Sequence, residues 1–151
     1  MVVETIKPRF LYKILTAAPS IPISRTLTSL DASDGFMHLS TPEQIPATAS
    51  RFFASSTTLW LVKLEREKLE SGPGELKWEG SESKDVFPHL YDADLGADAV
   101  SEVKEVLREH GQMWEDVMGD LQRGSEKTAF TGWIEHTFPA PGKGVDTEDL
   151  L

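Results

Sequence analysis

Residues 34–41 decide the fold of this chain, and they read Asp34-Gly35-Phe36-Met37-His38-Leu39-Ser40-Thr41. The Asp-Gly pair favours a turn, because glycine adopts positive φ without a Cβ penalty. The next five residues are expected to form a strand. Side chains alternate along a strand, so Phe36, His38 and Ser40 would share one face. The stretch therefore predicts an imidazole and a hydroxyl side by side at the end of a short strand.

A helix is predicted to follow this strand directly. Thr41 fits an N-cap, Pro42 would take the first helical position, and Gln44 stands three residues after the cap, which is the capping-box pattern. We expect a helix over residues 42–54 with an irregular first turn, because Pro46 lacks a backbone donor. The free N–H groups at its N-terminus would suit an anionic ligand.

The composition of the chain predicts one globular domain. Its 151 residues are enough for a substantial core, and it has no cysteine for disulfides or thiolate ligands. The formal net charge of −10 disfavours non-specific binding to nucleic acid or anionic membranes. No apolar run approaches the ~20 residues that cross a bilayer, and residues 1–7 lack the apolar segment of a signal peptide. We therefore expect a cytoplasmic protein without a membrane segment.

Three further segments have the composition of strands. Residues 9–15 are rich in aromatic and branched side chains, and residues 75–79 alternate between polar and apolar. Residues 58–64 are apolar almost throughout, which is typical of a central strand covered on both faces. Residues 65–71, between the last two, are charged and are expected to close as a turn of helix.

A long loop is predicted between the first strand and the Asp-Gly turn. Pro19 and Pro22 prevent a long helix over residues 17–33, which leaves room for one short helical turn. Loops of more than about a dozen residues are often functional. Arg25 is the only basic residue of this loop, and it is expected either to be a solvated charge or a member of a surface ion pair, or to contact a phosphate group.

Residues 85–91 are the second informative stretch, and they contain a proline inside a strand pattern. Because Pro88 has no N–H group, we expect this strand at a sheet edge or a bulge. Phe87, His89 and Tyr91 would share one face, which repeats the pattern of the first stretch. Two such strands predict a shallow ligand cleft, whereas a histidine that satisfies its hydrogen bonds in the core is the competing interpretation for each imidazole.

The C-terminal third is predicted to be mostly helical. Residues 98–110 carry apolar side chains at helical spacing, namely Ala99, Val100, Val103, Val106 and Leu107. Residues 112–123 carry a second apolar stripe, namely Met113, Trp114, Val117, Met118 and Leu121. A last strand is predicted over residues 128–138. The expected organisation is one domain over residues 1–138, with a core at about 10–107 and a helical extension at 108–124, followed by an acidic flexible tail at 139–151.

Several site chemistries are disfavoured by these patterns. No Gly-x-Ser-x-Gly nucleophile elbow, phosphate-binding loop or dinucleotide glycine fingerprint occurs. No two histidines have His-x-x-x-His spacing, so no metal is expected. What remains is a cleft with two imidazoles, a tyrosine, hydroxyls and a helix N-terminus. Such a group can bind phosphate or sugar hydroxyls and can transfer protons.

The order of these motifs resembles domain-of-unknown-function family 952 from about residue 10 to residue 107. The residues that carry the resemblance are the 34–41 stretch, Gln44, Phe52-Phe53, Leu76-Lys77-Trp78-Glu79 and Phe87-Pro88-His89-Leu90-Tyr91. That family is similar to the ADP-ribosyltransferase superfamily, in which two small sheets form a split β core around a cleft for NAD. The His38-Leu39-Ser40 strand also resembles the His-Leu-Ser strand of RNA 2′-phosphotransferases. The resemblance implies an α+β, ADP-ribosyltransferase-like split β core with flanking helices.

The resemblance also implies a function and its site residues. It implies an NAD-using transferase or hydrolase, or at least a domain that binds a nucleotide-like or phosphorylated small molecule, with Glu79 as a candidate by its chemistry for the transferase glutamate. We expect catalytic roles for His38 and His89, and ligand-binding roles for Ser40, Tyr91, Phe36, Thr41, Phe87 and Arg25. Two alternatives are a non-catalytic module that binds a ligand or a protein, and a biosynthetic enzyme that uses the two histidines as acid and base.

Overall fold

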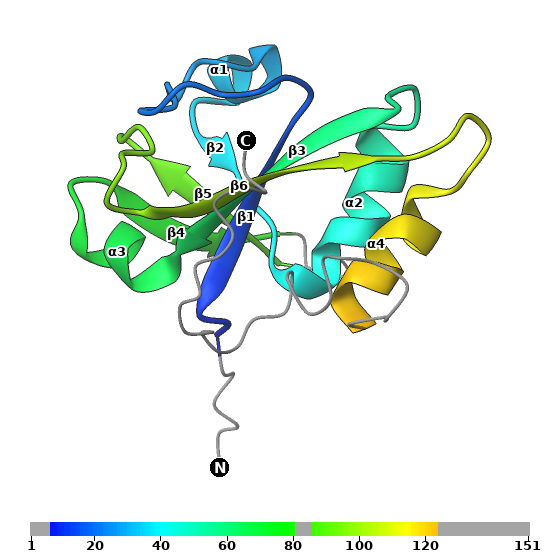
Figure 1. Ribbon diagram of the computed structural model, residues 1–151. Coiled ribbons are helices and arrows are strands. Elements are labelled where there is room, and N and C mark those ends of the chain that lie inside the picture. Colours follow the sequence, from blue (N-terminus) through cyan, green and yellow to red (C-terminus); the bar gives the residue numbers. More distant parts are fainter. Residues whose placement is uncertain (1–6, 81–85, 124–151) are drawn as a thin grey trace.

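Two small antiparallel sheets form the centre of the computed structural model, which describes residues 7–80 and 86–123 (Figure 1). The first sheet has the strand order β1-β3-β6, with β1 at Phe10–Leu15, β3 at Thr58–Glu65 and β6 at Val100–Leu107. The second sheet has the order β2-β5-β4, with β2 at Met37–His38, β5 at Phe87–Tyr91 and β4 at Glu75–Glu79. The fold is mixed α+β, as the sequence predicts.

The helices are short and lie around these sheets. They are α1 at Ser29–Asp34, the 3-10 helix η1 at Pro42–Gln44, α2 at Ile45–Phe52, α3 at Arg66–Ser71 and α4 at Trp114–Arg123. Figure 1 shows α2 and α4 side by side to one side of the first sheet, with β4 and β5 on its other side. The first sheet is therefore a layer between helices and a second sheet.

The alternation of β1 sends its side chains into two cores. Tyr12 and Ile14 pack with helix residues such as Ile45 and Trp114 in one core. A second core contains Leu11 and Leu15 together with Met37 and Leu90 of the second sheet, and further members are Ile23, Leu39, Val62, Leu64, Leu69, Ala93, Leu95 and Ala99. Because both faces of the first sheet are covered, β3 is apolar almost throughout and lies in the centre, as predicted.

The segment after the Asp-Gly pair joins the two sheets. Met37 and His38 pair with β5, whereas Ser40 and Tyr12 exchange backbone hydrogen bonds of 2.8 and 2.9 Å. Gly35 has φ of +86° and caps the C-terminus of α1, so the predicted need for a positive φ is confirmed. The predicted strand is shorter than expected, because its last residues leave the second sheet for the first.

The start of the next helix is irregular, as the prolines predict. Pro42–Gln44 form a turn of 3-10 helix before α2 begins, and the Gln44 side chain accepts a hydrogen bond of 3.0 Å from the Thr41 N–H. The predicted turn of helix after β3 is confirmed as α3, and the loop of residues 17–33 contains the start of α1.

The predicted helix over residues 98–110 is wrong, because residues 100–107 form strand β6. Val103 pairs with Val62 and Val106 pairs with Leu59 in an antiparallel ladder. The apolar residues happen to repeat every three or four positions, but β-branched valines fit a pleated sheet well. An inward strand position is occupied by Lys104, which is buried, so the alternation of a strand was hidden in the sequence.

The predicted edge position of the Pro88 strand is also wrong, because β5 is the central strand of the second sheet. The carbonyl of Pro88 accepts a hydrogen bond of 3.0 Å from the N–H of Leu39, just past the end of β2. The N–H and C=O of a strand residue point to the same side, so the donor that proline lacks would also face this side. A two-residue β2 lets a proline sit in the middle of the sheet without breaking the ladder with β4.

The predicted extension at residues 108–124 contributes Trp114 and Met118 to the core that contains Tyr12 and Ile14. Trp114 is 1% exposed, and its Nε1 donates a hydrogen bond of 3.0 Å to the carbonyl of Phe53. Arg108 donates to the carbonyls of Ser56 and Gln112 at 2.8 Å each. Met113, which the stripe placed in the core, is 52% exposed because α4 begins one residue later. The predicted strand at 128–138 and the tail at 139–151 lie outside the described residues.

Candidate functional site

His38 is held between two carboxylates of α1. Its Nδ1 lies 2.7 Å from Asp31 Oδ1, and its Nε2 lies 3.0 Å from Asp34 Oδ2. The backbone N–H of His38 also donates to Asp31 Oδ1, at 3.1 Å. Carboxylate oxygens only accept hydrogen bonds, so both contacts are hydrogen bonds when both ring nitrogens carry hydrogen. The short helix before the Asp-Gly turn therefore fixes the ring at the end of β2.

Asp31 itself belongs to a buried ion pair with Lys13 of β1. The Lys13 Nζ donates to Asp31 Oδ2 and, at 3.1 Å, to the carbonyl of His38. Burial lowers the pKa of the Lys13 ammonium, against the effect of the neighbouring carboxylate. Burial works to raise the pKa of Asp31, but hydrogen bonds from His38 and the charge and hydrogen bond of Lys13 together lower it below its ordinary value. Asp31 is therefore ionised at neutral pH.

His89 is held in the same manner by Glu79 of β4. The Nδ1 of His89 lies 2.8 Å from Glu79 Oε1, and the Tyr91 hydroxyl donates to the same oxygen at 2.7 Å. These hydrogen bonds from His89 and Tyr91 lower the pKa of Glu79. In return, the hydrogen bond to Glu79 is the largest cause that raises the pKa of Tyr91 to about 12. One carboxylate oxygen thus orients both an imidazole and a phenol.

Four aromatic rings meet on this face of the second sheet. His38 and His89 are partners in the ladder of β2 and β5, and their ring centroids lie 5.2 Å apart. The Phe36 ring lies 4.3 Å from His89, 4.7 Å from His38 and 5.0 Å from Tyr91. We call these rings and the carboxylates of Asp31, Asp34 and Glu79 the histidine cluster.

The other predicted site residues are placed differently. Phe87 is two residues before His89, on the same face of β5 by alternation. Ser40 is buried, and its backbone pairs with β1, whereas the Thr41 N–H is bonded to Gln44. The Arg25 guanidinium lies 3.6 Å from an Asp94 carboxylate oxygen, and its backbone N–H donates to the same carboxylate. The structure therefore brings together Phe36, His38, His89 and Tyr91 of the predicted set.

Sequence reasoning missed three charged residues of this site. Asp31 and Asp34 were assigned to a loop and a turn, and Lys13 was assigned to a strand without a role. A lysine inside an otherwise apolar strand was the available signal, because such a residue is buried only when it has a partner. The identity of that partner depended on a short helix that the sequence pattern did not specify.

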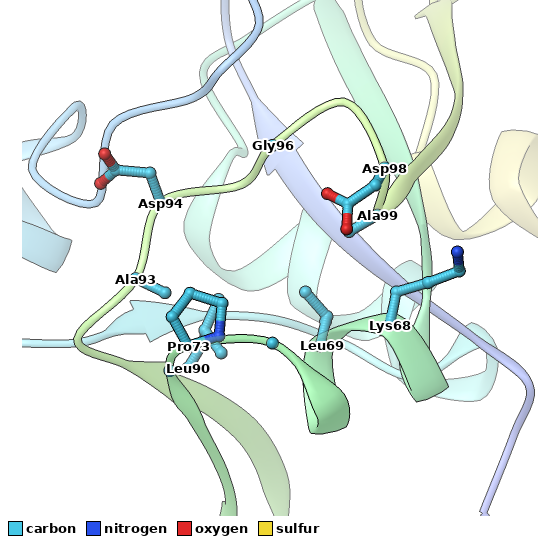
Figure 2. A pocket seen from close by; sticks show the side chains of 11 residues that line it. Lys68, Leu69, Pro73, Leu90, Ala93, Asp94, Gly96, Asp98 and Ala99 are labelled. Carbon is cyan, nitrogen blue, oxygen red and sulfur yellow. The ribbon is translucent and has the colours of Figure 1, made fainter.

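A separate hollow lies between the end of α3 and the loop that joins β5 to β6 (Figure 2). Figure 2 shows Leu69, Pro73 and Leu90 on one side, and the loop with Asp94, Gly96 and Asp98 on the other. Its lining contains no member of the histidine cluster. Asp94 is the partner of Arg25, so this arginine lies by the hollow.

Metal-binding groups and membrane-spanning helices are both absent from the described residues. Within residues 7–80 and 86–123, no three His, Asp or Glu side chains are grouped to hold a metal ion. In the same ranges, no helix has the length and apolar character needed to span a membrane.

The arrangement of the histidine cluster is suited to proton transfer, because each imidazole has a carboxylate on its Nδ1.

Comparison with known proteins places the chain in a family. A search of curated proteins gave no match. The crystal structure of protein CC0527 from Caulobacter crescentus is similar, with 30% identity and a TM-score of 0.57 over 73% of this chain and 98% of that one. A double mutant of the same protein matches with 29% identity, a TM-score of 0.57 and the same coverage. The model of the family described as "Protein of unknown function (DUF952)" matches residues 16–103. The chain therefore belongs to the DUF952 family.

Proposed function

We propose that the histidine cluster is the active site of an enzyme that acts on a small, nucleotide-like molecule, with His38 and His89 as its proton-transfer groups. The observation that carries this proposal is the facing pair of imidazoles, 5.2 Å apart, each with a carboxylate on Nδ1. A carboxylate in this position sets the tautomer and the orientation of the ring. Two such rings on one face can serve as acid and base for one bound molecule.

The class of ligand follows from the groups around the two rings. Phe36 and Tyr91 offer aromatic surface on which a flat heterocycle can stack. Glu79 is more than a third exposed, and a carboxylate of this kind accepts hydrogen bonds from ribose hydroxyls. The site thus suits the nucleoside part of a nucleotide better than its phosphates. NAD is the first candidate, because of the resemblance to the ADP-ribosyltransferase superfamily described above.

Lys77 is one cation that could bind a phosphate at this site, because its Nζ lies 4.6 Å from the centroid of the Tyr91 ring and its residue pairs with His89 in the ladder of β4 and β5. The two arginines that could have served, Arg25 and Arg9, are each paired with a carboxylate, Asp94 and Glu65 respectively. Lys13 is buried against Asp31, so its charge is already balanced. One lysine is few for a pyrophosphate, so we expect the sugar and the ring to contribute more to binding than the pyrophosphate. An acid–base enzyme that acts on a non-phosphorylated small molecule is the second candidate, and this same pairing favours it.

A ligand panel tests the proposal. Thermal unfolding is followed with NAD, ADP-ribose, nicotinamide, adenosine and inorganic phosphate, for the wild type and for His38→Asn and His89→Asn. Both substitutions keep a donor for the carboxylate while they remove the titratable ring. A ligand at 100 times its Kd stabilises the native state by about 2.7 kcal/mol. We expect stabilisation by NAD, ADP-ribose or adenosine, which each substitution reduces.

Products of the bound ligand are then followed by mass spectrometry. Turnover that both substitutions abolish supports an enzyme, whereas binding without turnover in the wild type supports a ligand-binding module. An unfolding temperature that no compound changes would contradict the nucleotide-like part of the proposal.

A further inference from the structure

A buried cation lies directly behind the histidine cluster. The Lys13 side chain is 5% exposed, and Asp31, its partner, is 2% exposed. β1 carries Lys13 on the face that is turned toward the second core, in the position that faces α1 and β2. A buried ion pair of this kind is weak evidence for a role in stability, because desolvation offsets much of the attraction between the two charges.

The two oxygens of Asp31 have different partners. Oδ2 accepts from the Lys13 ammonium, which fixes the plane of the carboxylate. Oδ1 accepts from the backbone N–H of His38 at 3.1 Å and faces the His38 Nδ1 at 2.7 Å. The N–H of Asp31 in turn donates a hydrogen bond of 3.1 Å to the hydroxyl oxygen of Thr28, which caps α1. Asp31 cannot turn without breaking several of these contacts.

The two nitrogens of His38 therefore have unequal surroundings. Nδ1 faces an ionised and buried carboxylate oxygen, which can only accept a hydrogen bond. Nε2 faces Asp34, whose side chain is 39% exposed and ends α1. An exposed carboxylate at a helix end can move aside, whereas the buried one is held on several sides. A ligand group can therefore reach Nε2 more readily than Nδ1.

We propose that Asp31, with Lys13 as its fixed counter-ion, is a positioning residue that keeps the hydrogen of the neutral His38 ring on Nδ1. The nitrogen that exchanges a proton with the ligand is then Nε2, at the place now occupied by the Asp34 carboxylate. The catalytic meaning of this inference rests on the proposed function. The tautomer itself does not.

Nitrogen-15 NMR of the histidine rings in the unliganded protein tests the inference. The pH is increased until the His38 ring holds a single hydrogen, and the chemical shifts of its two nitrogens then show which one carries it. His110, whose side chain is exposed, gives an internal reference for a ring without a fixed tautomer. We expect the hydrogen of His38 on Nδ1. A predominant Nε2–H form, or an equal mixture, would overturn the proposal.

Substitution separates positioning from folding. The double variant Asp31→Leu with Lys13→Met removes both members of the ion pair, so no lone charge remains buried. Where this variant is folded, His38 is expected to lose its preference for Nδ1–H and to carry the hydrogen on Nε2, which still faces the Asp34 carboxylate at 3.0 Å. An unchanged preference would assign the tautomer to another cause and contradict a positioning role. If the variant does not fold, the wild-type spectrum alone still decides the question.

The NMR result and the ligand panel can fail independently. A fixed Nδ1–H tautomer in a protein that binds none of the tested compounds would leave the positioning intact and remove the proposed function. Ligand binding in a protein whose His38 is an Nε2–H tautomer would support the proposed function and overturn the positioning role of Asp31.

Substitution of Asp34 by Asn adds a third comparison. If Asp34 occupies the ligand position, this variant is expected to bind the ligand found in the panel at least as tightly as the wild type.

Discussion

His38 and His89 are direct cross-strand partners, and their ring centroids lie 5.2 Å apart on one face of the second sheet. Each ring has a carboxylate on Nδ1, from Asp31 in one case and Glu79 in the other. Cross-strand neighbours are held at a fixed spacing by the backbone ladder. The relative position of the two imidazoles is therefore set by the sheet rather than by loops.

The bond between Tyr91 and Glu79 predicts a change in tyrosine ionisation. The chain has two tyrosines, and Tyr12 is fully buried, so Tyr91 is the one that titrates in the folded protein. In Glu79→Gln the pKa of Tyr91 should decrease from about 12 toward the ordinary value of about 10, because the negative acceptor is removed. Ultraviolet absorbance of the phenolate measures this. Glu75→Gln is the control and should lower the pKa of Tyr91 less; equal effects would contradict the assignment of the hydrogen bond.

The Lys13–Asp31 pair predicts a large cost when one partner is removed. Lys13→Met leaves a buried carboxylate without its cation and should lower the free energy of unfolding by about 3–5 kcal/mol. Arg9→Met, at an ion pair whose side chains are 50% and 25% exposed, should cost at most about 1 kcal/mol. Urea unfolding compares the two. The double variant with Asp31→Leu should cost less than the sum of the single changes, and simple additivity would contradict the coupling.

The acid dependence of stability should follow the lowered pKa of Asp31. A carboxyl whose pKa is lower in the folded state stabilises the protein above its unfolded pKa of about 3.9, and this stabilisation is lost as the pH falls through the folded value. The difference in unfolding free energy between the wild type and the double variant should therefore be constant from about pH 7 to 5 and decrease below about pH 4. A difference that increases in acid would have the wrong sign.

Trp114 is predicted to be essential although it lies beyond the matched family segment. Trp114→Ala removes a fully buried indole and its hydrogen bond to Phe53, and should lower the free energy of unfolding by about 3–5 kcal/mol. Met113→Ala, at the neighbouring exposed position, should change it by less than about 0.5 kcal/mol. Similar values for both variants would show that α4 is not part of the core.

Much of this fold could be predicted from local pattern, and the exceptions have physical causes. Gly35, Pro42 and the apolar run of β3 act through their own backbone or periodicity, so their structures were predictable. β6 was not, because its sheet pairing depends on β3 and a buried lysine interrupts its alternation. The central place of Pro88 depends on how short β2 is, which only the assembled sheet determines.

The candidate site shows the same division. Phe36, His38, His89 and Tyr91 were predicted on two strand faces, and the structure joins those faces through the pairing of β2 with β5. Lys13 and Asp31 are 18 residues apart, in a strand and a short helix. Contacts of that range are set by the tertiary fold, and the sequence pattern contains no periodicity that predicts them. For Arg25, the residue type and its loop position left open a solvated charge, a surface ion pair and a phosphate contact. The structure shows an ion pair with Asp94.

The most direct measurement compares the histidine cluster with the hollow beside α3 as the ligand site. Histidine rings and the methyl groups of Leu69 and Ala93 are labelled, and their NMR signals are followed during titration with NAD, ADP-ribose and adenosine. We predict that the ring signals of His38 and His89 move with a common saturation curve while the methyl signals of the hollow stay in place. Movement confined to Leu69 and Ala93, or no movement of either ring with any of the three compounds, would contradict the proposal that the histidine cluster binds a nucleotide-like molecule.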